Sequence, residues 1–265
     1  MPTLETNGIS QYYELLGDRK NPPVMLITGL GGAGASWGPQ IERFAERYFV
    51  ILPDHRGTGK SSRPADGYTI ANHATEMAAL IEHLGVGPTH LVGSSTGGCI
   101  AMAMCLDHAA TVKSSVVVSS FARMDAYMIR QFELRKKLTA QFGPREAYDA
   151  AALFLFSPRY AGAHPEAVAA WADRVASLPF ERDILVKRME MIMAFNERER
   201  LGAIKQPTLV VCGDQDLCTP LNLSEEIAQA IPGAALAVVK GAGHLVYLEG
   251  AQEFFGTVHA FIDRH

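Results

Sequence analysis

The chain has 265 residues, of which 48% are hydrophobic and 20% charged, an ordinary composition for a soluble globular protein. A formal net charge of −4 gives no reason to expect nucleic acid or an anionic membrane surface as a partner. No apolar run approaches the roughly 18 residues of a membrane span, and the first residues lack the features of a signal peptide. We therefore expect a cytoplasmic protein. Its four cysteines form no C-x-x-C pair and are expected to be small core residues.

Apolar runs predict a series of strands in the first and last parts of the chain. They lie at residues 10–16, 24–27, 48–52, 89–92, 112–119, 208–212 and 235–239. The first run alternates and is expected to be an edge strand, whereas the later, continuous runs are typical of strands buried on both faces. Helices are predicted between them at residues 37–47, 70–84, 99–106, 222–230 and 252–262. This alternation predicts an α/β fold, a mostly parallel sheet with helices on both faces, whose ligands bind at the carboxyl ends of the strands.

Residues 121–200 contain no convincing strand and interrupt this alternation. They predict several helices, broken at Gly143-Pro144, Ser157-Pro158, His164-Pro165 and Leu178-Pro179. The segment is rich in methionine and aromatic residues, which either line a pocket or pack inside the segment. We predict one core made of residues 1–120 and 201–265, with residues 121–200 inserted as a helical cap.

The segment Gly93-Ser94-Ser95-Thr96-Gly97 stands between a predicted strand and a predicted helix. A G-x-S-x-G sequence in this context is typical of a nucleophile elbow, a sharp turn that raises the central serine above the sheet. The glycine spacing makes Ser95 the predicted nucleophile and Ser94 its neighbour. The following helix directs free N–H groups to the same point, where a negative charge could be stabilised.

A serine hydroxyl needs a base within hydrogen-bond reach and a third group that orients the base. After a nucleophile elbow these follow in the order acid, then histidine. His244 follows the last predicted strand and is the predicted base. Asp216, after the preceding strand, is the predicted acid, with Asp214 as the runner-up and an acid after another strand as a third option. His55 lies in a turn and is expected to serve that turn, and the other histidines to lie on the surface or in the core.

Two backbone N–H groups are expected to hold the developing oxyanion, those of Thr96 and Leu30. Leu30 belongs to the glycine-rich loop at residues 29–34. This loop has neither the G-x-G-x-x-G of a dinucleotide site nor the Gly-Lys-Ser/Thr ending of a P-loop. We expect no cofactor and no bound metal.

Ser95, Asp216, His244, the elbow and the sequence DHRGTGKS at residues 54–61 resemble the α/β-hydrolase superfamily, in its serine-nucleophile branch. The resemblance covers nearly the whole chain outside the variable cap and implies the α/β-hydrolase fold. Within the superfamily the chain is similar to enol-lactonases, aminoacrylate hydrolases and small carboxylesterases.

The chain differs from many relatives at two positions of these motifs. It has Thr28 before Gly29, where many relatives carry His-Gly, and Ser94, where they often carry His. Serine at position 95 separates it from epoxide hydrolases and haloalkane dehalogenases, in which a carboxylate attacks. The Ser-Gly-Pro-Gly type of oxyanion loop of the meta-cleavage hydrolases is absent.

The residues and the resemblance together predict a cofactor-free serine hydrolase acting on a small-molecule substrate. The expected substrate is a small to medium, largely apolar ester, lactone or related acyl compound, cleaved through an acyl-enzyme on Ser95. Hydrolysis of a C–C bond or of an enamine such as aminoacrylate is the alternative on the same residues. Acyl transfer or perhydrolysis at Ser95 is a further option, and a non-catalytic ligand-binding receptor is the alternative of another class. Monomeric and homo-oligomeric states both stay open.

Overall fold

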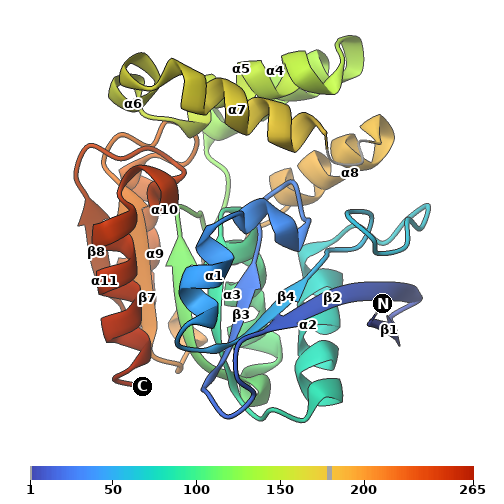
Figure 1. The fold of residues 1–265 in the computed structure, drawn as a ribbon, viewed down its shortest axis with the longest axis vertical. Coiled ribbons are helices and arrows are strands. Elements are labelled where there is room, and N and C mark those ends of the chain that lie inside the picture. Colours follow the sequence, from blue (N-terminus) through green and yellow to red (C-terminus); the bar gives the residue numbers. More distant parts are fainter. Residues whose placement is uncertain (1, 178–180) are drawn as a thin grey trace.

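The computed structural model describes residues 2–177 and 181–265, and its centre is a single eight-stranded sheet (Figure 1). The strands are β1 (Thr3–Thr6), β2 (Ile9–Leu16), β3 (Pro23–Ile27), β4 (Phe49–Pro53), β5 (Thr89–Ser94), β6 (Val112–Val118), β7 (Thr208–Gly213) and β8 (Ala235–Val239). In the sheet they lie in the order β1-β2-β4-β3-β5-β6-β7-β8. The pairs β1–β2 and β2–β4 are antiparallel and all the others are parallel, which confirms the predicted mostly parallel sheet.

The edge strand of the sheet is β1, not the run at residues 10–16 as the sequence predicted. That run forms β2 and pairs on both sides. Asn7 and Gly8 both have positive φ, 46° and 74°, and make the tight turn that folds β1 back onto β2. An Asn-Gly pair between two extended segments is a strong hairpin signal, so the sequence did contain the evidence for this strand.

Helices cover both faces of the sheet. Those that flank it are α1 (Gln40–Ala45), α2 (Ile70–Leu84), α3 (Thr96–Asp107), α9 (Leu221–Ala230), α10 (Val246–Glu249) and α11 (Ala251–Ile262). Short 3-10 turns occur at η1 (Gly34–Trp37), η2 (Ala109–Thr111) and η3 (Leu201–Ala203). The predicted helix at residues 37–47 is wrong in its first turn: Gly38 has φ of 57° and Pro39 follows it, so the helical hydrogen bonds begin only at α1.

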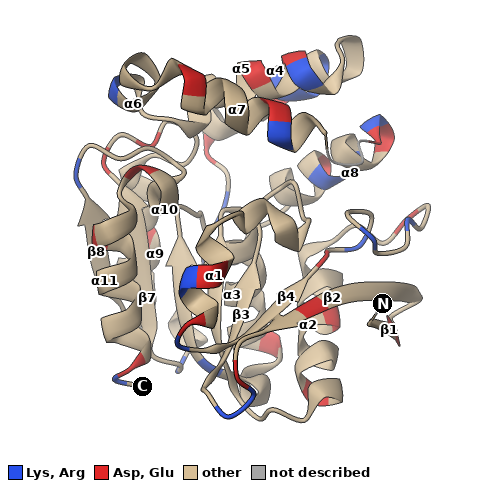
Figure 2. Cartoon of the chain, viewed as in Figure 1, with Lys and Arg blue, Asp and Glu red and all other residues tan. Residues whose placement is uncertain are grey.

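Alternate side chains of the parallel strands enter two separate apolar cores, as the period of two in a strand requires. On β3, Met25 and Ile27 pack with α2, α3 and α9, whereas Val24 and Leu26 pack with α1 and α11. The strands β3, β4, β5 and β7 carry no Asp, Glu, Lys or Arg residue, and most such residues lie along the helices and loops (Figure 2). Burial on both faces explains why these strands read as continuous apolar runs.

Between β6 and β7 the chain forms a group of helices that lies above the sheet in Figure 1. They are α4 (Ala126–Gln141), α5 (Pro144–Leu155), α6 (Pro158–Ala163), α7 (Pro165–Ala176) and α8 (Arg182–Met193). The first three predicted breaks fall between these helices, with a proline in the first turn of each helix that follows, where its missing N–H costs nothing. The break at Leu178-Pro179 lies outside the described residues. The division into a core and a cap at residues 121–200 stays a prediction.

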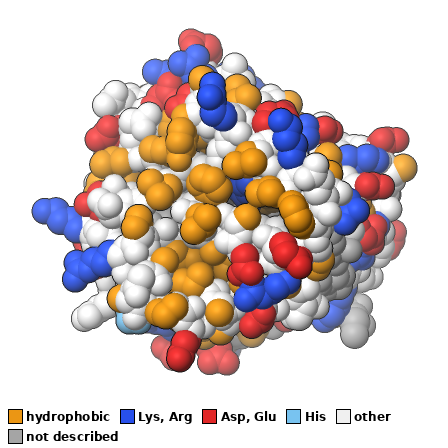
Figure 3. All heavy atoms as spheres, turned by 90° about the horizontal axis from the view of Figure 1, so that it is seen from above, with side chains coloured by type: hydrophobic (Ala, Val, Ile, Leu, Met, Phe, Trp, Pro, Cys, Tyr) orange, Lys and Arg blue, Asp and Glu red, His pale blue; other side chains and the backbone are white. Residues whose placement is uncertain are grey.

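The surface over these helices carries both hydrophobic and charged side chains. Seen from above, hydrophobic side chains gather among charged ones across this face (Figure 3). Large hydrophobic residues exposed on α4, α5 and the turn between them are Tyr127, Ile129, Leu134, Phe142 and Leu153. Among the described helices, none has the length and the apolar composition needed to cross a membrane.

A buried arginine joins α8 to the core beneath it. Arg188 is 1% exposed, and its Nε donates a hydrogen bond to the Leu30 carbonyl at 2.9 Å. Its Nη1 donates to the Arg56 carbonyl at 3.2 Å. These bonds fix α8 to the loops that follow β3 and β4, including the glycine-rich loop of residues 29–34.

Two buried histidines also contact the Arg188 guanidinium. Its Nη1 lies 3.1 Å from His73 Nε2, and its Nη2 lies 3.0 Å from His55 Nδ1. A guanidinium has only donors, so both ring nitrogens must accept. His73 donates its Nδ1–H to the Thr69 carbonyl at 2.8 Å, which fixes the tautomer that leaves Nε2 free to accept. Burial, then the neighbouring Arg188 charge, lower the pKa of His73 to about 3 and hold the pKa of His55 well below its usual range.

We expect the free energy of unfolding to decrease with acidity because of these histidines. The pKa of His73 is lower in the folded protein than its unfolded value of 6.5, so unfolding takes up a proton at intermediate pH. The contribution of His73 is therefore fully present above pH 6.5 and is lost as the pH falls from 6.5 toward 3. Its slope approaches ~1.4 kcal/mol per pH unit. Urea unfolding at pH 8, 7, 6 and 5 measures this slope, which His73→Gln should reduce.

The exposed His83 lies on the same helix, so His83→Gln controls for the loss of an imidazole from α2. Equal pH slopes for the native protein and His73→Gln would contradict the assignment of a neutral, Arg188-bound His73.

Candidate active site

Ser95 occupies a strained turn between β5 and α3. Its backbone has φ of 55° and ψ of −117°, a conformation that a residue with a side chain adopts only when its surroundings enforce it. The Ser95 N–H donates to the Val118 carbonyl at 2.8 Å, and the Ser120 hydroxyl donates to the Ser95 carbonyl at 2.8 Å. Both partners come from the end of β6 and the residues after it, so the neighbouring strand holds the turn in place.

The glycines around Ser95 allow backbone to pack against backbone. A Cβ on Gly93 would lie 2.2 Å from the Gly97 carbonyl oxygen. A Cβ on Gly97 would lie 2.1 Å from the carbonyl oxygen of Ile27, the last residue of β3. Neither contact could be relieved by turning a side chain, so these positions require glycine. The first turn of α3 is thereby brought against the end of β3.

His244 and Asp216 are brought together from the loops after β8 and β7. His244 Nδ1 lies 2.9 Å from Asp216 Oδ2, and both side chains are buried. Asp216 also accepts hydrogen bonds from the backbone N–H groups of Cys218 and Thr219, both at 2.8 Å, and from the Thr219 hydroxyl at 2.8 Å. These donors fix the carboxylate, which in turn orients the imidazole with Nδ1–H as donor and leaves Nε2 as an acceptor.

The loop that carries His244 is held by two other carboxylates. Glu249 accepts from the Gly243 N–H at 3.1 Å and from the Ser157 N–H at 3.0 Å, so it links this loop to the start of α6. Asp214, the runner-up for the acid, accepts from the Gly241 N–H at 2.6 Å. This hydrogen bond therefore connects the loop after β7 to the loop after β8.

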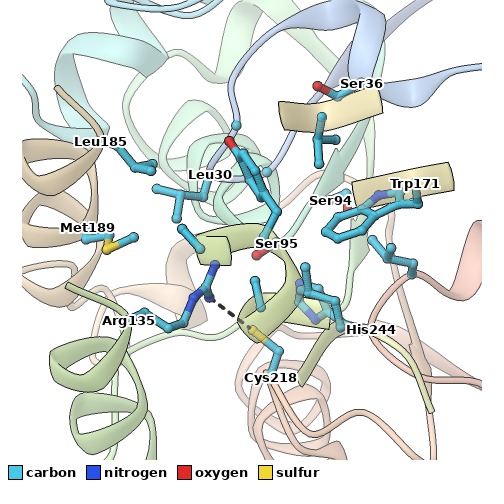
Figure 4. Close-up of a pocket in the computed structure, with 18 of the residues that line it drawn as sticks. Leu30, Ser36, Ser94, Ser95, Arg135, Trp171, Leu185, Met189, Cys218 and His244 are labelled. Carbon is cyan, nitrogen blue, oxygen red and sulfur yellow. Dashed lines mark hydrogen bonds between the residues drawn. The ribbon is translucent and has the colours of Figure 1, made fainter. Parts of the chain in front are cut away.

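Ser95 and His244 line the same pocket, a cavity of about 140 Å³ between the sheet and helices α4, α5, α7 and α8 (Figure 4). Ser95 is partly exposed to it. Within residues 2–177 and 181–265, Ser95 Oγ makes no hydrogen bond, so its pairing with His244 Nε2 stays a prediction. Hydrogen bonds of this kind are often long in ligand-free proteins and shorten when substrate binds.

The predicted oxyanion donors lie at the ends of two neighbouring strands. Leu30 follows β3 and lines the pocket, and Thr96 is the first residue of α3. Their N–H groups have no acceptor among the described residues, as an oxyanion site requires. The loop passes close to the serine: a Cβ on Gly29 would lie 3.3 Å from Ser95 Cβ and 3.9 Å from Ser95 Oγ. Their role in catalysis stays a prediction.

The rest of the pocket wall comes largely from helices whose inward residues could not be chosen from the sequence. The methionine and aromatic residues of this segment that line the pocket are Phe132, Tyr148, Trp171 and Met189, whereas Phe121, Met128, Phe156, Met191 and Phe195 are buried in the packed interior. Arg135 and Thr139 also line it, and no sequence pattern distinguishes these two residues or Tyr148 from the others on their helices. The described residues contain no cluster of three or more His, Cys, Asp or Glu side chains that could hold a metal ion.

Comparison with known proteins places this site in a large family. The family model of the alpha/beta hydrolase fold matches residues 22–251. A relative from Azorhizobium caulinodans, provisionally named the carbamate hydrolase RutD, is 36% identical over 245 residues, which cover 92% of this chain and 91% of the relative.

Solved structures of other proteins also align with this chain over nearly its whole length. The enol-lactonase from Burkholderia xenovorans LB400 aligns with a TM-score of 0.89 at 26% identity, covering 99% of this chain and all of that one. An enzyme described as degrading N-acyl homoserine lactones aligns with a TM-score of 0.85 at 30% identity, covering 98% and 100%. The chain thus belongs to the α/β-hydrolase family and is a hydrolase.

Proposed function

We propose that this hydrolase cleaves a small to medium, largely apolar ester, lactone or related acyl compound, with Ser95 as nucleophile, His244 as base and Asp216 as the group that orients the base. The observation that carries the proposal is the 2.9 Å hydrogen bond between His244 Nδ1 and Asp216, in the same pocket that Ser95 lines. The proposal is also supported by the free N–H groups of Leu30 and Thr96 beside the serine.

In the first half of the reaction, Ser95 Oγ attacks the substrate carbonyl while its proton passes to His244 Nε2. The C–O double bond opens, and its electron pair moves to the oxygen, which the N–H groups of Leu30 and Thr96 stabilise. Asp216 stabilises the imidazolium that forms. The tetrahedral intermediate then expels the leaving group, which takes the proton from His244, and an acyl group remains on Ser95.

In the second half, water replaces the leaving group. His244 removes a proton from water, the hydroxide attacks the acyl carbonyl, and the same two N–H groups stabilise the second oxyanion. Collapse breaks the bond to Ser95 Oγ, which recovers its proton from His244, and releases the acid. Ser95 and His244 therefore end in their starting protonation states: the first serine proton departs with the leaving group, a proton from water replaces it, and no cofactor takes part.

A second candidate substrate class is a carbamate. The provisional name of the relative from Azorhizobium caulinodans, at 36% identity, favours it. A carbamate also presents a carbonyl to Ser95, so the same residues would serve. A non-catalytic receptor has no such support, since the relative from Azorhizobium caulinodans and the two solved structures described above are named as hydrolases or lactone-degrading enzymes.

Ser95→Ala should reduce kcat on p-nitrophenyl acetate or butyrate on the order of 10³-fold or more, because the remaining groups cannot form an acyl-enzyme. A fluorophosphonate probe should label the native protein at Ser95 and fail to label this variant. The Ser94→Ala variant is the control for the adjacent serine, and the probe should still label it at Ser95. Circular dichroism and urea unfolding check that Ser95→Ala keeps its fold. Unchanged turnover in a folded Ser95→Ala protein would refute the assignment of the nucleophile.

The two neighbouring aspartates allow a matched test of the acid. Asp216→Asn should reduce kcat on the order of 10³–10⁴-fold, because the amide favours the wrong tautomer of His244. Asp214→Asn keeps an acceptor oxygen for the Gly241 N–H and should retain most of the native kcat. Steady-state hydrolysis of p-nitrophenyl acetate at pH 8 measures both. The larger loss in Asp214→Asn would make Asp214 the acid instead.

A further inference from the structure

Arg135 is the one charged side chain, apart from the titratable His244, among the described residues that line the pocket. It lies on α4, and in Figure 4 its guanidinium points into the pocket in the direction of Ser95. The wall around it is apolar or uncharged, with Phe132, Leu185 and Met189 among its members. Arg135 is partly buried there, and a partly desolvated cation favours an anion or a set of acceptors as its partner.

No carboxylate of the described residues compensates Arg135. Its hydrogen bond within residues 2–177 and 181–265 runs from Nη1 to Cys218 Sγ at 3.8 Å, a weak acceptor. The adjacent Lys136 behaves differently, because its Nζ lies 3.6 Å from Glu133 and 3.1 Å from Glu190. Arg145, on α5, is likewise paired with Asp149 and Asp173. Lys136 and Arg145 are thus paired with carboxylates within the protein, whereas Arg135 forms no ion pair among the described residues.

The guanidinium is held in a fixed place although its charge is unpaired. Its central carbon lies 4.7 Å from the centre of the Phe132 ring, one helical turn earlier on α4, and its Nη1 also contacts Cys218 Sγ. Such a planar fork, fixed by packing, matches the two oxygens of a carboxylate better than a point charge would.

Two hydroxyl groups extend this polar end of the pocket. Thr139 lies one turn after Arg135 on α4, and Tyr148 lies on α5; both line the pocket. Neither hydroxyl has a hydrogen-bond partner in the described part of the chain. Arg135 lies close enough to Tyr148 for its positive charge to oppose the rise in the pKa of that phenol that burial causes. Hydroxyls beside a guanidinium can donate to the same anion.

We propose that Arg135 binds a carboxylate of the substrate, so that the hydrolysed compound is an acyl compound whose far end carries a carboxylate. This proposal rests on the proposed function, since it assumes that the carbonyl of the same molecule reaches Ser95. It narrows the substrate class from a largely apolar compound to an anionic one with an apolar middle. A cavity of about 140 Å³ has room for a short apolar segment between the two ends of that compound.

Binding tests the anion site without catalysis. Calorimetry with Ser95→Ala protein should show that glutarate binds, and adding Arg135→Gln should weaken this binding about 10- to 100-fold. Combining Ser95→Ala with Arg135→Lys should give a glutarate affinity between those of these two proteins, because a lysine keeps the charge attraction but loses the two parallel hydrogen bonds. Arg130→Gln is the matched control, since Arg130 lies on the exposed face of the same helix and outside the pocket. Failure of Ser95→Ala to bind glutarate, or equal binding with and without Arg135, would overturn the proposal, and so would tighter binding of inorganic phosphate.

Kinetics then test the substrate class. Monomethyl glutarate and methyl pentanoate have the same acyl chain length, with and without a terminal carboxylate, and a pH-stat follows both. The native protein should prefer the anionic ester, and Arg135→Gln should reduce the ratio of the two kcat/KM values about 10- to 100-fold. Arg130→Gln should keep the native ratio. A native ratio below one, or the same ratio in Arg135→Gln, would overturn the proposal. Absence of fluorophosphonate labelling in the native protein would instead defeat the proposed function, and the calorimetry would still decide the role of Arg135.

Discussion

The close contact of backbone with backbone at the start of α3 is the constraint on which the site depends. Gly97 packs closely against the Ile27 carbonyl at the end of β3, and Gly93 packs closely against the backbone of Gly97. Because β3 and β5 are neighbours in the sheet, this contact brings three features to one point: the strained Ser95, the first N–H of α3 and the loop that contains Leu30. A side chain at either glycine would clash with backbone and force this contact apart. Without this contact, the N–H groups of Leu30 and Thr96, which we propose as oxyanion donors, would not lie beside the serine.

The other half of the site is assembled independently of that turn. His244 and Asp216 follow β8 and β7, and β7 is separated from β5 by β6. Their geometry depends on hydrogen bonds between loops: Thr219 and Cys218 to Asp216, Gly241 to Asp214, and Gly243 to Glu249. The sheet fixes the distance between the two halves, and the loops fix the orientation of the imidazole. Helix α6 takes part through Ser157, so the helices above the sheet help to hold this loop.

Most of the fold could be predicted because its determining features are local. A strand buried on both faces reads as an apolar run, and α2 was predicted with the bounds that the structure has, since its apolar spacing and the glycine after it define it. Strand β1 was missed because four residues with two exposed side chains carry no apolar pattern. Ser95, His244 and Asp216 could be proposed from the order of strands and loops, but their distances could not.

The pocket wall depends on tertiary contacts, which a single sequence does not report. Arg135 and Lys136 are adjacent cations on one helix, and only the packing of α4 decides which of them enters the pocket. Likewise, Lys187 and Arg188 follow one another on α8. Lys187 Nζ donates to the exposed Ala65 carbonyl, whereas Arg188 is buried between His55 and His73, more than a hundred positions earlier.

The cluster of Arg188, His55 and His73 has a consequence for the divergence of related chains. Its three members come from α8, from the turn after β4 and from α2, yet they satisfy one another's hydrogen bonds in a space that admits little else. Loss of the arginine would leave two imidazoles and two carbonyls without donors, and loss of either imidazole would leave a buried cation short of acceptors. Substitutions at these positions should therefore occur together rather than singly. A graft of α8 from another hydrolase would succeed only if the recipient's core supplied acceptors that match the incoming side chain.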